Sequence, residues 1–164
     1  MRTGSEDGTQ RTLLKKYVTI TTGSEMQTFL PYRNFEKSAM HLDNKRLGKQ
    51  RVECLQILKA LTNPKYGWQN HPAVKMWKGY EHALVEYGIE ICDEWVGRGF
   101  KDTCREKIVN IALTLPFRQD MPEWLGDEKL HASHRANLKR KDPEFYGRFA
   151  WDEPDYLPYI WPVQ

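Results

Sequence analysis

The sequence has few cysteines and no long apolar run, and both shortages narrow the class of protein. Its three cysteines, Cys54, Cys92 and Cys104, are an odd number with no CxxC spacing, so we expect reduced thiols in the core. No stretch approaches the roughly 18 apolar residues that a membrane helix needs, and the first residues lack the apolar stretch of a signal peptide. We therefore expect a cytoplasmic protein without membrane contact.

The sequence also lacks a strong net charge and a glycine-rich phosphate-binding loop. Lys and Arg number 25 against 22 Asp and Glu, so any nucleic-acid footprint must come from local clustering of cations. Aromatic residues are plentiful instead, with 6 Trp, 8 Tyr and 6 Phe, which predicts a core built from large rings. A chain of 164 residues suits one domain, since domains most often hold roughly 100 to 150 residues.

The chain divides into a polar appendage and a main domain. Residues 1–25 form the appendage, in which the β-branched alternation at 16–22 favours a strand or an extended arm. Residues 26–164 form the main domain, and residues 26–31 lead into it as a short extended segment.

Helical periodicity dominates the main domain. Apolar side chains recur at helical spacing over 38–61, and again from Pro72 to Trp95, where the pattern is nearly unbroken and Gly97 and Gly99 follow. Two further helices are predicted at about 102–115, capped by Asp102, and at about 127–141. The sequence thus predicts a mainly α protein: a compact helical bundle, one domain, with an irregular aromatic- and proline-rich tail over 145–164.

One candidate site lies on the first predicted helix. Arg46, Lys49, Gln50 and Glu53 are three, four or seven residues apart and share a face, and Arg51 lies nearby. A carboxylate among cations suits an enzyme on DNA, because the cations hold phosphates while the carboxylate moves a proton or steadies positive charge at the sugar. The alternative is an ordinary solvated helix face with pairs such as Lys49 with Glu53, and spacing alone favours that alternative.

A second candidate site is the basic helix at about 127–141. Its polar face is rich in hydrogen-bond donors that suit phosphates or a base edge. The alternative is a charged surface helix ended by Asp142 and Pro143, and the sequence weighs the two evenly. The predicted DNA-binding residues are His131, His134, Arg135, Asn137, Lys139, Arg140 and Lys141, with His71 from the loop before Pro72.

Histidine and aromatic residues offer further chemistry. His131 and His134 are three residues apart but have no third ligand at a metal-like spacing, so we expect neither a metal nor a cofactor. Most aromatic residues of the second predicted helix fall on its inward stripe and are expected in the core. The better candidates for stacking on bases are Tyr66, Trp68, Tyr156, Tyr159 and Trp161.

Two stretches resemble a known family. The stretch from His71 through Thr103, which ends with Arg98-Gly99-Phe100 and Asp102-Thr103, resembles the central helix of the pyrimidine-dimer DNA glycosylases, the phage endonuclease V family. The stretch from Leu47 to Glu53 is similar to the segment that carries their catalytic glutamate. The whole span from 26 to 162 also resembles uncharacterised bacterial and phage proteins of that group.

The resemblance implies a DNA repair enzyme with glycosylase and abasic-site lyase activity. In the family an amine at the N-terminus attacks C1′ of a damaged nucleotide, and a flipped nucleotide opens the double-stranded DNA. Carried over, Glu53 is the acid-base residue, while Arg46 replaces a family histidine and Arg51 lies beside a family arginine. The family's small first residue is replaced by Met26-Gln27 behind 25 further residues. The nucleophile is therefore an amine at Met1 or Met26, or a lysine such as Lys45 or Lys49.

Two other functions stay open at this point. One is a DNA-binding protein that has kept the fold without catalysis, and the other is a phage-type enzyme that transfers a group to a DNA base. In each case we expect a monomer that binds DNA.

Overall fold

The computed structural model describes residues 26–163, and the predicted strand or arm at 16–22 lies outside them. The prediction of a mainly helical fold is confirmed, and no strand occurs in the described part of the chain. None of its helices is long and apolar enough to cross a membrane. The elements are α2 (Phe35–His41), α3 (Asn44–Thr62), α4 (Pro72–Lys75), α5 (Glu81–Gly97), α6 (Cys104–Ala112), α7 (Glu128–Lys141), α8 (Pro143–Tyr146) and the 3-10 helix η1 (Gly147–Phe149).

The first predicted helix is in fact two helices, α2 and α3. The chain is extended at Leu42 and Asp43, which separates them. Asp43 is fixed there from a distant part of the sequence, because its N–H donates to the Tyr146 hydroxyl at 3.0 Å and its carboxylate accepts from that hydroxyl. A tertiary contact thus breaks a pattern that locally favours one helix.

The second predicted helix is also interrupted. It begins at Pro72 as predicted, with the His71 ring accepting from the Ala73 N–H, but α4 ends at Lys75. Gly79 has φ of +87°, a left-handed conformation that glycine adopts without strain. The Glu81 carboxylate accepts from the Gly79 N–H at 3.1 Å, and α5 starts from that turn.

The last two predicted helices lie close to their predicted positions. The Asp102 carboxylate accepts from the N–H groups of Cys104 and Arg105 at the start of α6, and the Asp127 carboxylate caps α7. The tail is less irregular than predicted, because α8 and η1 occupy residues 143–149 and only the part beyond them lacks helices.

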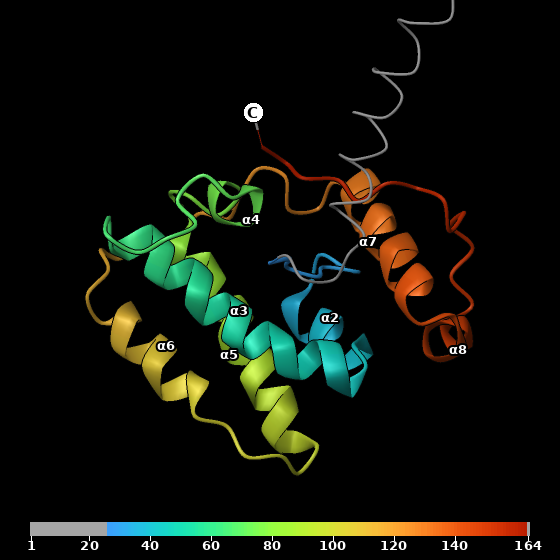
Figure 1. The fold of residues 1–164 in the computed structure, drawn as a ribbon, viewed down its shortest axis with the longest axis horizontal. Coiled ribbons are helices and arrows are strands. Elements are labelled where there is room, and N and C mark those ends of the chain that lie inside the picture. The colour runs from blue at the N-terminus through green and yellow to red at the C-terminus, as the bar shows by residue number, and fades with distance from the viewer. Residues whose placement is uncertain (1–25, 164) are drawn as a thin grey trace, which may run out of the picture.

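Helices α3, α5 and α6 pack together on one side of the molecule, with α7 and α8 on the other (Figure 1). Glycines bring α3 and α5 close: a Cβ at Gly88 would lie 2.5 Å from the Cys54 sulfur, and one at Gly48 would lie 2.9 Å from the Trp95 ring. All three cysteines are buried and free, as the sequence predicted.

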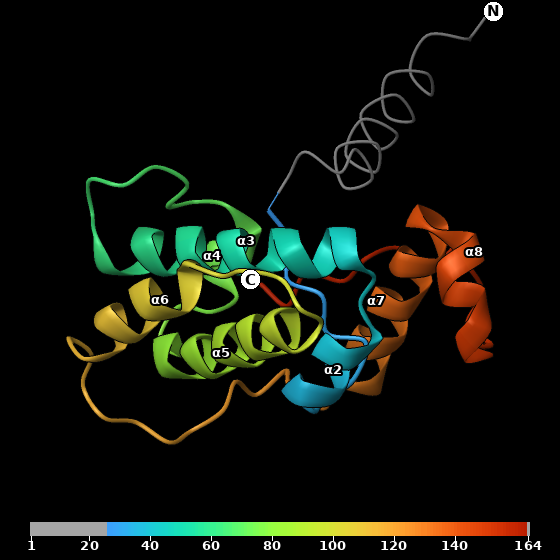
Figure 2. The same cartoon turned by 90° about the horizontal axis from the view of Figure 1, so that it is seen from below.

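Residues 26–31, called the strap below, run between these two sides, as both views show (Figures 1 and 2). All six residues are buried although the segment has no regular secondary structure. Buried peptide groups must find hydrogen-bond partners, and the strap has no neighbouring strand to provide them. Side chains from the surrounding helices and the tail therefore determine its position.

Candidate active site

Helices α3 and α5 hold the strap on one side through one glutamine and one tyrosine. The Gln50 amide donates to the Gln27 carbonyl at 2.8 Å and its oxygen accepts from the Phe29 N–H at 3.1 Å. The Tyr87 hydroxyl bonds both the Phe29 carbonyl, at 2.8 Å, and the Gln50 oxygen, at 2.7 Å. Gln50 and Tyr87 are almost completely buried, so these bonds are shielded from water and fix the strap firmly.

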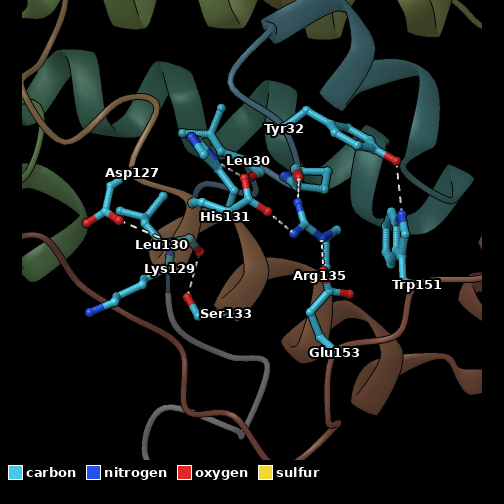
Figure 3. Close-up of polar contacts among 12 residues, drawn as sticks. Leu30, Tyr32, Asp127, Lys129, Leu130, His131, Ser133, Arg135, Trp151 and Glu153 are labelled. Carbon is cyan, nitrogen blue, oxygen red and sulfur yellow. Dashed lines mark hydrogen bonds and ion pairs between the residues drawn. The ribbon is translucent and has the colours of Figure 1, made fainter.

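Helix α7 holds the other side of the strap. The Leu30 N–H donates to Nδ1 of His134 at 3.0 Å, and Nδ1 of His131 lies 2.8 Å from the Leu30 carbonyl. Arg135 donates to the Pro31 carbonyl at 2.7 Å and is itself paired with Glu128 and Glu153 (Figure 3). Burial lowers the pKa of His134 to about 3, so the ring is neutral and the lone pair on Nδ1 can accept the hydrogen bond from the Leu30 N–H.

The tail closes the strap from a third direction. The Tyr159 hydroxyl donates to the Thr28 carbonyl at 2.6 Å, and the Tyr159 ring stacks on His134 with centroids 4.1 Å apart. The Trp77 indole donates to the Thr28 hydroxyl at 3.2 Å. The strap is thus bonded from α3, α5, α7, the residues after α4 and the tail.

Glu53 lies at the start of the strap. Its carboxylate accepts from the Gln27 N–H and from the Gln50 amide, each at 3.0 Å, and the Lys49 ammonium lies 3.4 Å away. Only 4% of Glu53 is exposed, and this burial raises the pKa of its carboxyl against the opposing effect of those partners. A carboxyl group with a raised pKa, held beside cations, is suited to accepting and returning a proton.

Cations gather around this carboxylate from two helices. Arg46 and Lys49 come from α3, and Lys141 comes from the last turn of α7. Arg46 is paired with Asp43 at 3.1 Å. Burial lowers the pKa of Lys141, and the charges of Arg46 and Lys49 lower it further while Glu53 opposes them. Lys49 and Gln50 contact Glu53 directly, whereas Arg46 pairs with Asp43, and the sequence placed Lys141 with a different site.

Arg51 lies on another side of α3. It pairs with Asp102 at 2.5 Å, and its guanidinium stacks over the Trp95 ring at 4.5 Å from the centroid. These contacts join α3 to the segment between α5 and α6, so the structure does not bring Arg51 together with Glu53. A catalytic role for Arg51 stays a prediction that its position does not support.

Most of the predicted DNA-binding residues of α7 point inward. His131, His134, Arg135 and Asn137 are buried, and the first three bond the strap. These side chains turn inward because the buried peptide groups of the strap need hydrogen-bond partners. The helical periodicity of α7 gives no sign of that requirement. Direct contact of these four side chains with DNA stays a prediction that the buried arrangement does not favour.

The three cations that follow on α7 differ in their surroundings. Lys139 donates to the carbonyls of Trp151 and Glu153, and Arg140 donates to those of Asp155 and Leu157. These two side chains thus hold the tail, whereas Lys141 shows no hydrogen bond or ion pair among residues 26–163.

The aromatic residues divide largely as predicted. Trp77 and Tyr87 are completely buried, and Trp68 and Tyr156 are exposed. Tyr159 is a correction, because it is only 4% exposed and cannot stack on a base in this arrangement. His71 lies between Trp68 and Trp161, with ring centroids 5.7 and 5.8 Å away.

Two features of the site were not predicted from the sequence. The Gln27 peptide nitrogen becomes a partner of Glu53 only because the strap folds inside, and the side-chain amide nitrogen of Gln27 is buried without a partner in the described residues. Tyr87 was predicted to lie in the core, but the role of its hydroxyl in bonding the strap was not predicted. The spacing of residues along a helix does not indicate either feature.

A cavity of about 660 Å³ lies elsewhere, between the start of α2, α5 and the loop before α7. Three glutamates, Glu36, Glu86 and Glu90, line it together with one cation, Arg33. Glu53 is not part of it, and a lining with an excess of carboxylates does not suit a phosphate backbone. Within the described residues, no group of His, Cys, Asp and Glu side chains is arranged to hold a metal ion.

Comparison with known proteins gives one match. The model of a family described as pyrimidine dimer DNA glycosylase matches residues 26–107, which is half of the chain. The match begins at the strap and includes Glu53. No curated protein and no solved structure matches the chain significantly.

Proposed function

Because the chain belongs to the pyrimidine dimer DNA glycosylase family, whose activity is DNA repair, we propose that it removes damaged or modified pyrimidines from DNA. In this proposal an amine attacks C1′ of the damaged nucleotide, the base leaves, and the resulting imine allows cleavage of the strand as an abasic-site lyase. The substrate is double-stranded DNA with a flipped nucleotide, since the reacting carbon is not accessible inside a stacked duplex.

One observation carries the proposal: Glu53 is a buried carboxyl group with a raised pKa at the centre of a cationic group. In this proposal Arg46, Lys49 and Lys141, whose charges act on one another around Glu53, hold phosphates on either side of the reacting sugar. Glu53 then transfers protons at the sugar as the bond to the base breaks and the ring opens.

The test uses borohydride, which reduces an imine between protein and DNA to a stable bond. Duplexes with an abasic site or a thymine dimer are incubated with the full chain and with Glu53→Gln, which keeps the shape and the hydrogen-bond acceptor. We expect the wild type to form a covalent adduct and Glu53→Gln to lose about 100-fold or more in rate, as loss of an acid-base group does. Glu106→Gln, at an exposed position of α6, is the matched control and should behave as wild type.

A second function is favoured by one specific feature. The nitrogen next to Glu53 belongs to the peptide bond between Met26 and Gln27, and a peptide nitrogen is not a nucleophile. A protein that binds DNA without catalysis would tolerate this arrangement. Binding of the duplex by wild type without any adduct would support that function and exclude the glycosylase.

A further inference from the structure

The loop between α3 and α4, residues 63–71, is held in place by the side chain of Gln69. Its amide donates to three carbonyls at 2.6 to 3.0 Å, those of Ala60, Asn63 and Tyr66. The His71 N–H donates to the Trp68 carbonyl at 2.9 Å. These bonds join the loop to the last turns of α3, so its backbone has little freedom to change shape.

Trp68 is strained in this loop and is also exposed. Its φ is +73°, a left-handed conformation that is unfavourable for a bulky side chain. More than half of the residue, 55%, is exposed, so burial of the indole ring offsets only part of that strain. Strained backbone that the surrounding fold maintains occurs most often at positions that bind a ligand.

A series of aromatic rings connects Trp68 with the strap. The Trp68 ring lies 5.7 Å from the His71 ring, and the His71 ring lies 5.8 Å from the Trp161 ring, measured between centroids. Trp161 lies 4.6 Å from Tyr159, whose hydroxyl donates to the Thr28 carbonyl. The end of the tail, which carries Trp161, lies beside α4 in both views (Figures 1 and 2).

The inner end of this series adjoins the candidate active site. Thr28 directly follows Gln27, whose N–H donates to the Glu53 carboxylate at 3.0 Å. Burial raises the pKa of Tyr159, and the charge of Glu53 raises it further, so the carboxylate lies close enough to act on that ring. Trp68 is therefore the exposed outer member of a series of rings that begins beside Glu53.

The charge around the loop suits DNA. From residue 54 to residue 80 the sequence has neither Asp nor Glu but four lysines, all of them exposed: Lys59, Lys65, Lys75 and Lys78. One carboxylate from elsewhere, Glu123, lines a pocket with two of these lysines, which leaves the segment with an excess of positive charge. Lysines attract phosphates, and aromatic rings stack on bases, so a DNA strand presents both groups that this segment can bind.

From this placement we propose that Trp68 stacks on a DNA base beside the damaged nucleotide, a proposal that rests on the proposed function. When a nucleotide flips out of a duplex, its neighbours lose a stacking partner. The indole ring offers a flat apolar surface in place of that partner. Because every base has such a face, Trp68 favours DNA with a gap in its stack over intact DNA and does not read its sequence.

The experiment measures binding of the full chain to labelled duplexes by fluorescence anisotropy at several salt concentrations. One duplex carries an abasic site and the other is intact. Trp68→Asn removes the ring, and asparagine adopts the left-handed conformation more readily than most residues; Trp68→Phe keeps a smaller ring. The matched control is Phe117→Asn, which removes an aromatic side chain that is 86% exposed in the loop before α7. Urea unfolding checks the stability of each variant.

We expect Trp68→Asn to bind the abasic-site duplex about 10-fold or more weakly than wild type, as loss of a stacking ring does, and to bind the intact duplex almost as well. Trp68→Phe should lose less, and Phe117→Asn should bind as wild type does. The salt dependence should be unchanged in Trp68→Asn, because no phosphate contact is lost. Its urea midpoint should equal or exceed that of wild type, because the backbone strain is relieved. A fluorescent adenine analogue placed next to the abasic site should be quenched by wild type and less so by Trp68→Asn.

Equal binding of the abasic-site duplex by folded Trp68→Asn would overturn the inference and leave the proposed function intact. A salt slope reduced by about one, the sign of a lost phosphate contact, would overturn it as well. So would a lower urea midpoint for Trp68→Asn, since the ring would then serve the stability of the fold. The borohydride test decides the proposed function separately: weaker binding by Trp68→Asn with no adduct from wild type would support the stacking contact and exclude the glycosylase. No binding of either duplex by wild type would overturn both.

Discussion

Acid should weaken this protein through one residue, His134. Its Nδ1 accepts the Leu30 N–H, so the ring must stay neutral there for the strap to remain bonded. The pKa of His134 is lowered from 6.5 to about 3, first by burial, while His131 and Arg135 contribute repulsion. Folding lowers the pKa of this histidine, so the folded state has its full stability at pH values above the pKa of the unfolded chain. That stability is lost as the pH falls from the unfolded pKa toward the folded pKa, because only the unfolded ring takes up a proton there.

The size of the effect follows from the unfolded pKa. At pH 5 the unfolded ring is protonated and the folded ring is not, and pH 5 lies about 1.5 units below 6.5. At about 1.4 kcal/mol per unit, the free energy of unfolding should fall by about 2 kcal/mol between pH 7.5 and pH 5 through His134 alone. The exact folded pKa hardly matters, because any value well below 5 gives the same result.

Urea unfolding at several pH values tests this, with His134→Asn as the comparison. Asparagine can offer an oxygen to the Leu30 N–H but does not titrate, and all other ionisable groups are shared by the two proteins. We expect the fall in stability between pH 7.5 and pH 5 to be about 2 kcal/mol smaller in His134→Asn. Equal falls in the two proteins would refute the view that a neutral His134 holds the strap.

Two further predictions concern helix packing and the stability lost by burying Glu53. Gly88→Ala should lower the free energy of unfolding by about 1 to 3 kcal/mol, because the added carbon would lie 2.5 Å from the Cys54 sulfur and 3.0 Å from Ile108. Thermal melting measures this change, and Gly97→Ala, which has no atom near the added carbon, is the control. Glu53→Gln should unfold at higher urea than wild type at pH 7.5, since a carboxyl whose pKa is raised by burial destabilises the fold once it ionises. That advantage should shrink as the pH falls toward 4.5, and an advantage independent of pH would contradict the reasoning.

The fold class was predictable because it depends on periodicity. The apolar spacing after Pro72, the caps at Asp102 and Asp127, and the glycines after Trp95 all act locally, and the helices occur near their predicted positions. The breaks at Asp43 and Gly79 were missed for different reasons. The first depends on Tyr146, 103 residues away, and the second on a single glycine within an otherwise continuous pattern.

The candidate site was predictable in part for the same reason. Arg46, Lys49 and Glu53 share a face of α3 by spacing alone, and the structure pairs Lys49 with Glu53. The position of Lys141 depends on how α7 lies across the strap, which no local pattern encodes. His134 and Arg135 were predicted to face DNA, but their partners are peptide groups of the strap. Almost every residue carries such groups, so the sequence does not show which side chains will bind them.

The strap also determines when during synthesis this site can exist. Its carbonyl at Thr28 is bonded by Tyr159, 131 residues later in the chain, and its Leu30 N–H by His134, 104 residues later. Helices α3 and α5 can pair early, since the contacts between them span shorter loops. The complete site instead has a high contact order: until residue 159 has left the ribosome, the Thr28 carbonyl lacks the hydroxyl group that bonds it in the folded protein.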